Sequence, residues 1–258
     1  EPVRTWRSNV LGTLNILESL RLSKLPASCV LITSDKCYSN NEWYWGYREN
    51  DPLGGADPYS ASKAAAEIAI NSYCQSYFSD LISPTRIARA RAGNVIGGGD
   101  WSPNRLIPDC ARAWLSHSTL HLRSPDGVRP WQHVLEALNG YLLLGFMLNQ
   151  NPSIHSHAFN FGPSRSSCVS VKKIAECLTT IWPNFSYVTS PSDTQIHETI
   201  TLALNTDKAY AMLHWTPLLA FEDTISLTAN WYSSVALAQV TPYNAVSADI
   251  MSFMKLVS

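Results

Sequence analysis

The sequence predicts an α/β protein built on a doubly wound parallel sheet, because three segments alternate as such a fold requires. Residues 28–33 form a short apolar run rich in β-branched side chains, typical of a buried parallel strand. Residues 59–77 are alanine-rich and contain neither glycine nor proline, which favours a long helix. Residues 85–96 favour a second strand that leads into the glycine turn at residues 97–99.

The remaining elements follow from the same kinds of pattern. Apolar residues recur at helical spacing over residues 8–23, with Ser8 or Asn9 as the expected cap. Helices are expected over residues 106–116, 134–148, 171–182, 222–236 and 244–257, and short strands or apolar segments at residues 120–122, 158–161, 187–189 and 201–204. The pattern becomes less regular beyond Gly162. We therefore expect one domain over residues 1–162 and a smaller C-terminal α+β domain over residues 163–258.

Composition excludes several classes of protein. The chain has 258 residues, 45% of them hydrophobic, so it can bury a full core. Its formal net charge of -1 gives no field that would gather nucleic acid or an anionic membrane surface. No apolar run approaches the roughly 20 residues of a membrane-spanning helix, and the N-terminus does not read as a signal peptide.

Cysteine and histidine spacing predicts a cytoplasmic protein without a metal site. The six cysteines are scattered and form no C-x-x-C pair, which is typical of reduced thiols in the cytosol. His155 and His157 are two residues apart, but no third ligand lies near them in the sequence.

Tyr59 and Lys63 are the first candidate catalytic pair. They are four residues apart in a predicted helix, so one helical face presents a phenol and an ammonium together. A cation about 4 Å from a phenolate stabilises it by on the order of 4 kcal/mol at an effective dielectric of about 20, which allows a phenol to act as a base. The same spacing also occurs by chance in most proteins. Here the pair opens a helix that follows a buried strand, and ligands of parallel sheets bind at strand ends.

Ser34, Asp35 and Lys36 stand where the first predicted strand ends. They offer a hydroxyl, a carboxyl group and an amine within three residues. Taken alone, the triplet reads as a transition from strand to loop with solvated charges. With Tyr59 and Lys63 downstream, we interpret it as a second part of the same catalytic site.

Longer segments, taken together, resemble the signature block of the CDP-glucose 4,6-dehydratases. This family of nucleotide-sugar enzymes belongs to the extended short-chain dehydrogenase/reductase superfamily. The similar segments lie at residues 9–15, 34–38, 41–55, 57–63, 91–101, 105–109 and 129–135. The resemblance covers nearly all of residues 1–236 and is far more specific than the Tyr/Lys pair.

The resemblance implies a three-step dehydration with NAD as the cofactor. Tyr59, held as phenolate by Lys63, would take the proton of the sugar's 4-hydroxyl while a hydride leaves carbon 4. Lys36 would then remove the 5-proton as Asp35 protonates the departing 6-hydroxyl, and the hydride returns to carbon 6. Ser34 would hydrogen-bond the 4-oxygen.

The resemblance also implies binding residues. The NAD contacts within this chain would be Asn9, Tyr59 and Lys63. Guanidinium forks and amides suit phosphate oxygens, so three side chains are candidates for the diphosphate of the substrate. They are Asn94, Arg105 and Arg129. An arginine before proline, as Arg129 is, equally caps a helix or pairs with a carboxylate, and that alternative stays open.

The glycine loop of a dinucleotide site is not found in this sequence. Gly97-Gly98-Gly99 does not have the G-x-G-x-x-G spacing and follows a late strand, so we interpret it as a turn beside the substrate. By resemblance the true loop would lie roughly 80 to 100 residues before Glu1. The expected fold is thus a Rossmann-like domain over residues 1–162, truncated at its N-terminus, with residues 99–130 contributing to the substrate side and residues 163–258 forming the nucleotide-sugar domain.

The function that the resemblance implies is the conversion of CDP-glucose to CDP-4-keto-6-deoxyglucose and water. Such a lyase would serve deoxysugar synthesis for lipopolysaccharide O-antigen, and its relatives commonly form homodimers or homotetramers. Two alternatives stay open: another NAD-dependent nucleotide-sugar epimerase or dehydratase, and a nucleotide-sugar binding remnant without turnover. The Asp35-Lys36 pair favours dehydration, because an epimerase has no leaving group to protonate.

Overall fold

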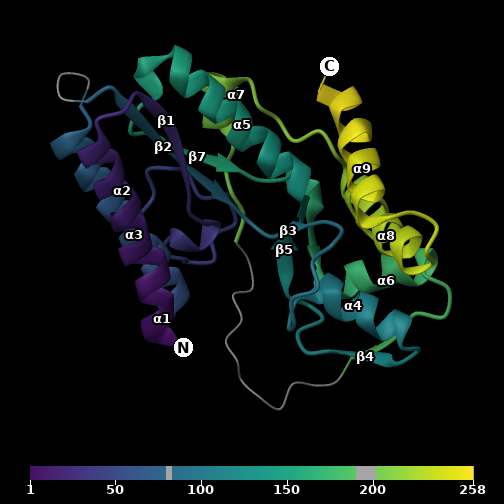
Figure 1. Cartoon of the computed structure of the whole chain (residues 1–258). Coiled ribbons are helices and arrows are strands. Elements are labelled where there is room, and N and C mark those ends of the chain that lie inside the picture. Colours follow the sequence, from purple (N-terminus) through teal and green to yellow (C-terminus); the bar gives the residue numbers. More distant parts are fainter. Residues whose placement is uncertain (80–82, 190–201, 258) are drawn as a thin grey trace. The chain divides into compact units, whose positions relative to one another are not determined.

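A computed structural model of the chain describes residues 1–79, 83–189 and 202–257 (Figure 1). They form two compact units that interleave along the chain. Unit 1 comprises Glu1–Gly93, Leu138–Gly162 and Leu202–Thr216, and unit 2 comprises Asn94–Ala137, Pro217–Ser258 and the described part of Pro163–Thr201. The units therefore do not correspond to a single cut of the chain at Gly162. The assignment of NAD to residues 1–162 and of the nucleotide sugar to residues 163–258 stays a prediction.

Unit 1 is built on a parallel sheet with the strand order β1-β2-β7. Its strands are β1 (Ala27–Ile32), β2 (Thr85–Ala92) and β7 (Ala158–Phe161). The strands predicted near residues 28–33 and 158–161 are confirmed. The prediction for residues 85–96 was wrong at its end, because the chain leaves the strand at Gly93 and Asn94 and Val95–Ile96 form a separate strand, β3, in unit 2.

Helices cover both faces of this sheet (Figure 1). Along β2, Ile87 packs with residues of helices α2 (Gly12–Ser23) and α3 (Pro58–Tyr77). Its neighbours Ala88 and Ala90 pack instead with residues of α5 (Val134–Gln150) and α7 (Asp207–Leu213). Because successive strand side chains point to opposite faces, this alternation defines a three-layer, doubly wound arrangement.

The N-terminal helix is longer than the sequence pattern predicts. Helical backbone starts with α1 (Pro2–Trp6), continues through a π-helical stretch, η1 (Arg7–Leu11), and runs into α2. The predicted cap at Ser8 or Asn9 was therefore wrong: Glu1 stands at the cap position, and Pro2 suits the first helical position because its φ is already helical. Asn9 makes a tertiary hydrogen bond instead of capping.

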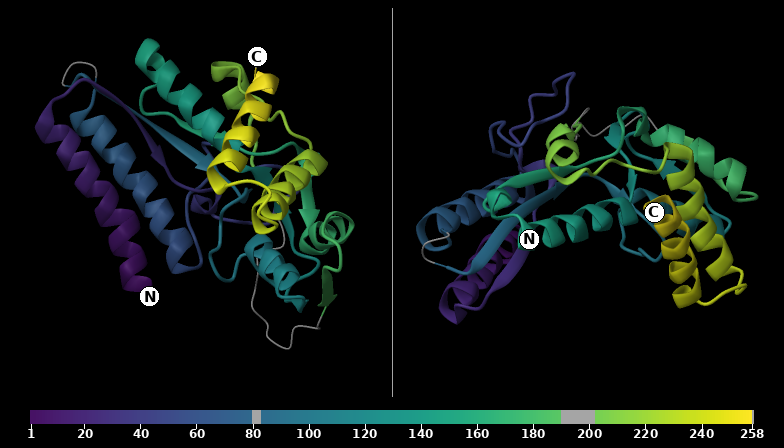
Figure 2. Two further views of the ribbon diagram at one scale, coloured as in Figure 1. Left: turned by 45° about the vertical axis from the view of Figure 1, so that its right-hand side comes forward. Right: turned by 90° about the horizontal axis from the view of Figure 1, so that it is seen from above.

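Helix α3 begins at Pro58, one residue before the predicted start, and ends at Tyr77 as expected. Asp57 caps it, with one carboxylate oxygen accepting from the backbone N–H groups of Tyr59 and Ser60. The cap fixes the first turn, in which Tyr59 lies. Helices α2 and α3 pack side by side in unit 1 (Figure 2).

Unit 2 contains short strand pairs and helices around its own core. The strand pairs are β3 with β6 (Gln132–His133), β4 (Thr119–Leu122) with β9 (Ser186–Thr189), and β5 (Val128–Pro130) with β8 (Cys168–Ser170). The helices are α4 (Leu106–Leu115), α6 (Val171–Ile181), α8 (Phe221–Ala236) and α9 (Pro242–Val257). In the core, the rings of Trp114 and Trp182 stack with centroids 5.0 Å apart. The helices predicted from the sequence in this region are confirmed to within two residues at each end.

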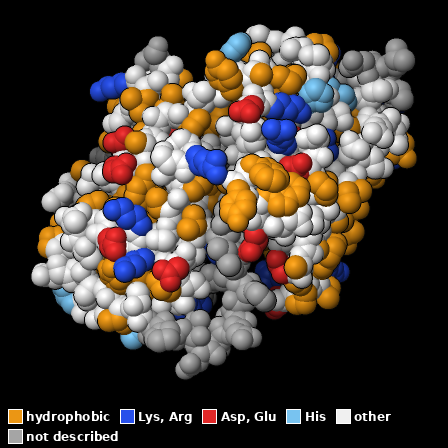
Figure 3. Space-filling model, turned by 180° about the vertical axis from the view of Figure 1, so that it is seen from behind, with side chains coloured by type: hydrophobic (Ala, Val, Ile, Leu, Met, Phe, Trp, Pro, Cys, Tyr) orange, Lys and Arg blue, Asp and Glu red, His pale blue; other side chains and the backbone are white. Residues whose placement is uncertain are grey.

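Three short helical turns complete the description: η2 (Asp35–Cys37), η3 (Pro152–Ile154) and η4 (Arg165–Ser167). Of the predicted apolar segment at residues 201–204, Thr201 lies outside the described residues, while Leu204 forms a parallel bridge with Tyr47. Among the described residues, no helix has the length and hydropathy needed to cross a membrane. On the face shown in Figure 3, basic and acidic side chains are interspersed, in keeping with the net charge of -1.

Candidate active site

Ser34, Asp35 and Lys36 follow the carboxyl end of β1 as a tight turn. Ser34 caps η2, and its Oγ accepts the backbone N–H of Lys36 at 3.2 Å. The same hydroxyl donates to Oδ1 of Asp35 at 2.9 Å. The structure therefore places the triplet in one turn, in which the side chain of Ser34 contacts both the Asp35 carboxylate and the Lys36 backbone.

The carboxylate of Asp35 and the ammonium of Lys36 form a close but unequal pair. Nζ of Lys36 lies 3.6 Å from Oδ1 of Asp35, whose side chain is only 3% exposed, whereas that of Lys36 is 41% exposed. Asp35, which is buried, is thus held by Ser34, and the exposed ammonium of Lys36 can reach a ligand. The two charged groups therefore lie at ion-pair distance, beyond the reach of an ordinary hydrogen bond.

Tyr59 and Lys63 lie one turn apart near the start of α3. The Tyr59 side chain is exposed, at 43%, while Lys63 is half-buried. Burial lowers the pKa of Lys63 below its ordinary value, and the nearby Cys37 and Glu67 act in the opposite direction. Helix α3 packs against η2, so the two predicted catalytic segments are neighbours in unit 1.

Asp57 connects these segments electrostatically. Burial alone would raise its pKa, but hydrogen bonds from Ser60 and Tyr59, together with the charge of Lys36, hold the pKa of Asp57 below its ordinary value. The helix cap is therefore ionised at neutral pH, as the positive N-terminal end of a helix favours.

Asn9 is linked to the first turn of α3 by a short chain of hydrogen bonds. Its Nδ2 donates to Oγ of Ser62 at 2.9 Å, and that hydroxyl donates to the backbone oxygen of Tyr59 at 2.7 Å. Asn9 lies in the π-helical stretch η1, a backbone form that is frequent at functional sites. All six residues predicted for catalysis or NAD binding therefore lie in unit 1: Asn9, Ser34, Asp35, Lys36, Tyr59 and Lys63.

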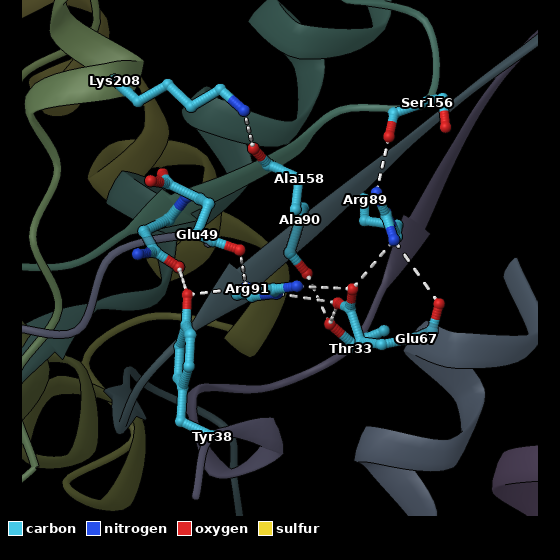
Figure 4. Close-up of polar contacts among 11 residues, drawn as sticks. Thr33, Tyr38, Glu49, Glu67, Arg89, Ala90, Arg91, Ser156, Ala158 and Lys208 are labelled. Atoms are coloured by element: carbon cyan, nitrogen blue, oxygen red, sulfur yellow. Dashed lines mark hydrogen bonds and ion pairs between the residues drawn. The ribbon is translucent and has the colours of Figure 1, made fainter. Parts of the chain in front are cut away.

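A buried polar network that sequence reasoning missed lies beneath these residues (Figure 4). Glu67, on α3, is fully buried and receives a forked pair of hydrogen bonds from Arg91 of β2, at 2.9 and 2.7 Å. Arg89 lies 3.5 Å from the same carboxylate. Burial would raise the pKa of Glu67, but the hydrogen bonds and charges of Arg91 and Arg89 outweigh it and lower the pKa.

A sequence signal for this network exists. Arg89 and Arg91 alternate with alanines in the second half of β2, and Glu67 stands four residues after Lys63. Buried charges are almost always paired, so two arginines on one face of a buried strand indicate a nearby carboxylate. The sequence does not identify Glu67 as this carboxylate, because it lies more than 20 positions from both arginines.

The three residues predicted to bind the substrate diphosphate belong to unit 2. Arg105 stands at the N-cap position of α4 without a side-chain cap and forms an ion pair with Asp100 at 3.1 Å. Arg129 lies in β5, half-buried, and one Nη donates to the backbone oxygen of Val128 at 2.9 Å. The backbone oxygen of Asn94 accepts the N–H of Gln132 at 3.1 Å. Their role in substrate binding stays a prediction.

No group of three or more histidine, cysteine or acidic side chains with metal-binding geometry occurs among the described residues. All six cysteines are described, and all are free thiols. Burial raises the pKa of the Cys37 thiol, which lies next to Lys36 in the turn, to about 12.

Comparison with solved structures establishes the fold class. The chain superimposes on an epimerase from Methanothermobacter thermautotrophicus with a TM-score of 0.78, at 21% identity, over 91% of this chain and 67% of that one. It superimposes on the NAD complex of a dTDP-glucose 4,6-dehydratase from Bacillus anthracis with a TM-score of 0.72, at 22% identity, over 91% and 70%. The predicted Rossmann-like α/β fold with a parallel sheet is therefore confirmed.

Sequence comparison establishes the family. The family model described as GDP-mannose 4,6 dehydratase matches residues 1–228, and the chain belongs to that family. It is 38% identical over 237 residues to the CDP-glucose 4,6-dehydratase of Salmonella typhimurium, which covers 91% of this chain. The match spans 66% of that relative's own length, just under two thirds.

Proposed function

We propose that the protein is an NAD-dependent lyase that dehydrates CDP-glucose to CDP-4-keto-6-deoxyglucose. The observation that carries the proposal is the Lys36–Asp35 pair, 3.6 Å apart at the end of β1, in the same unit as Tyr59 and Lys63. Oxidation at carbon 4 by NAD needs only a tyrosine and a lysine from the protein. The loss of water needs an additional base and acid, which this pair supplies. Membership of the family and the likeness to the Salmonella enzyme support the same reaction.

Each side chain then has a defined task. Tyr59, with the ammonium of Lys63 one turn away, accepts the proton of the 4-hydroxyl. Ser34 would turn its one hydroxyl proton from Oδ1 of Asp35 to the 4-oxygen as charge builds on it. Lys36, as an amine, would remove the 5-proton while Asp35, as a carboxylic acid, would protonate the departing 6-hydroxyl, and Lys36 would return its proton to carbon 5 when the hydride reaches carbon 6. One water is released, and the proton that Tyr59 takes from the 4-hydroxyl replaces the one that Asp35 gives up.

NAD fits the residues of unit 1 that lie beside the strand ends. An exposed phenol and a half-buried ammonium on α3 are donors suited to a ribose, and they lie beyond the carboxyl ends of parallel strands, where such folds bind ligands. Tyr59, Lys63 and Asn9 would hold the cofactor within this chain. When bound, NAD would supply the hydride acceptor and donor of the reaction.

The remaining assignments rest on the resemblance and on the charges of unit 2. Arg129, Asn94 and Arg105 would contact the diphosphate of the nucleotide sugar, since Arg129 and Arg105 bring positive charge to unit 2. The product would enter deoxysugar synthesis for lipopolysaccharide O-antigen. Six free thiols suit the cytoplasm, and apolar side chains exposed on α2 and α3 suit assembly into a homodimer or homotetramer.

The experiment that tests the proposal is mass spectrometry of CDP-, dTDP-, GDP- and UDP-glucose after incubation with NAD. The protein is expressed from its gene, together with any coding sequence that precedes residue 1 in the same reading frame. Loss of one water from CDP-glucose is expected, and Tyr59→Phe should reduce the rate by about 10²- to 10⁴-fold, because the catalytic base is removed.

The alternatives give distinct outcomes in the same assay. Water lost from another nucleotide sugar would change the substrate and keep the reaction. A change of sugar configuration without loss of mass would indicate an epimerase. Binding without any conversion would indicate a protein that holds nucleotide sugars without turnover, and it would overturn the proposal.

A further inference from the structure

Thr33 connects the end of β1 with helix α3. It directly precedes Ser34, and its Oγ1 donates to Oε1 of Glu67 at 2.5 Å. Its backbone N–H donates to the oxygen of Ala90 at 2.8 Å, continuing the hydrogen bonding of the sheet. Both Thr33 and Glu67 are buried, so water does not compete for the bond between their side chains.

Glu67 occupies the same face of α3 as the two residues assigned to catalysis. It follows Lys63 by one turn and Tyr59 by two. The bond from Thr33 therefore joins the segment that carries Ser34, Asp35 and Lys36 to the helix that carries Tyr59 and Lys63. The two segments are adjacent at this point in Figure 4.

Arg91 holds Glu67 in one orientation. Its guanidinium donates to both carboxylate oxygens, and a third nitrogen position donates to the hydroxyl of Tyr38 at 2.8 Å. Tyr38 lies two residues after Lys36, so the same arginine also fixes the chain that leaves the triplet. A fork of this kind fixes direction as well as distance.

We propose that Glu67 is a positioning residue, which holds the Ser34-Asp35-Lys36 turn in register with the face of α3 that carries Tyr59 and Lys63. The inference rests on the proposed function in one respect, namely that both segments act on one sugar. The other part of the inference, that the bond from Thr33 to Glu67 keeps residues 34–36 in their turn, does not depend on the function. The two parts can be tested separately.

The test replaces Thr33 and leaves the buried ion pair intact, because Glu67→Gln would strand the charge of Arg91 and unfold the chain. Thr33→Val removes the hydroxyl bond to Glu67, and Thr33→Ser keeps it. Thr85→Val is the matched control: this buried threonine donates to the backbone oxygen of Leu25 at 2.8 Å at the opposite end of the same sheet.

Hydrogen exchange followed by mass spectrometry measures the local stability of the turn at residues 34–36 and needs no substrate. In Thr33→Val, amides of residues 35–38 should exchange about tenfold faster than in the wild type, as expected for the loss of one buried hydrogen bond. Thr33→Ser and Thr85→Val should leave that exchange within about twofold of the wild type. Unchanged exchange in Thr33→Val, or equal acceleration in Thr85→Val, would overturn the proposal.

Kinetics with the nucleotide sugar measure the consequence. We expect Thr33→Val to lower kcat by about tenfold or more with KM within about twofold, since misplaced catalytic groups reduce turnover more than binding. Thr33→Ser should restore kcat, and Thr85→Val should retain it. If the wild type dehydrates no nucleotide sugar, the proposed function fails, and the exchange result alone decides whether Glu67 positions the turn.

Discussion

Asp35 and Lys36 are neighbours in the sequence, yet their side chains have opposite surroundings. Asp35 is buried and takes a hydrogen bond from Ser34, while Lys36 extends toward solvent. The difference arises because η2 turns the chain within three residues, so that consecutive side chains leave it in different directions. A single turn can thus present an acid and a base with separate access to one ligand.

His133 is a buried residue whose titration should be visible in the stability of unit 2. Its side chain is 2% exposed, and burial lowers its pKa to about 4 from an ordinary 6.5. The unfolded chain therefore binds a proton in the range from about 6.5 to 4, where the folded chain does not. The contribution of His133 to the free energy of unfolding should therefore fall by on the order of 2 kcal/mol as the pH falls from 7 to 5.

Urea unfolding at both pH values measures this effect, and His133→Gln should remove it. His121→Gln, at an exposed histidine of the same unit, should leave the difference in place. Burial raises the pKa of Glu136, which acts in the opposite sense, but Glu136 is present in every variant and cancels in the comparison. An equal pH dependence in wild type and His133→Gln would contradict the assignment.

At the scale of single residues, sequence reasoning identified what is local and missed what is distant. The triplet at residues 34–36 and the pair Tyr59 and Lys63 are defined by short spacings, and the structure places the triplet in one turn and the pair one helical turn apart. The bond between Thr33 and Glu67 joins residues 34 positions apart, and that between Arg91 and Tyr38 joins residues 53 apart. Such pairs depend on strand register, which no local pattern specifies.

Among the elements, helix α5 shows how one glycine differs from another. A Cβ atom at Gly140 would lie 2.3 Å from Cδ1 of Phe161 in β7, which is a severe overlap, whereas one at Gly145 would lie 3.6 Å from Cγ2 of Val30, an ordinary contact. Gly140 therefore permits the helix to approach the sheet. Gly145 has no such role.

Two alanine substitutions in α5 should accordingly have opposite effects. Gly145→Ala should stabilise unit 1 by about 0.5–1 kcal/mol through helix propensity. Gly140→Ala should destabilise it by about 1–3 kcal/mol, because overpacking outweighs the same gain. Chemical denaturation of the two variants measures both, and stabilisation by Gly140→Ala would show that Phe161 moves aside without cost.

Element prediction succeeded where the periodic signal was long. Helices at residues 59–77 and 134–148 were expected from runs of good helix formers, and both are present. Residues 8–11 of η1 were expected to be helical, but their π form was not predicted, because i→i+5 bonds leave no distinct apolar period. Helix α7 was missed because seven residues give too short a pattern. The two-residue strands β3 and β6 are defined only by their pairing.

For the whole molecule, the exposed apolar side chains of α2 and α3 are the feature that predicts assembly. Ile16 on α2 is 51% exposed and Ile68 on α3 is 61% exposed. Apolar surface on two adjacent helices favours burial against another copy of the chain. The double variant Ile16→Glu, Ile68→Glu should therefore become monomeric, with its melting temperature at low concentration unchanged.

Sedimentation equilibrium measures this prediction. The wild type should sediment as a dimer or tetramer and the double variant as a monomer. Leu142→Glu, a matched change at an exposed leucine of α5, should keep the wild-type mass. A wild type that sediments as a monomer at all concentrations would show that these helices serve another purpose.

The interleaving of the two units has a consequence for how such proteins diversify. Trp215 and Lys208 complete unit 1, with Lys208 donating to the backbone oxygen of Ala158 and Trp215 packing on Phe161, although both follow most of unit 2 in the sequence. A single recombination crossover between related genes would therefore join the early part of one unit 1 to the late part of another. Unit 2 should therefore change mainly by point substitution, because its exchange as one gene segment would also exchange part of the core of unit 1.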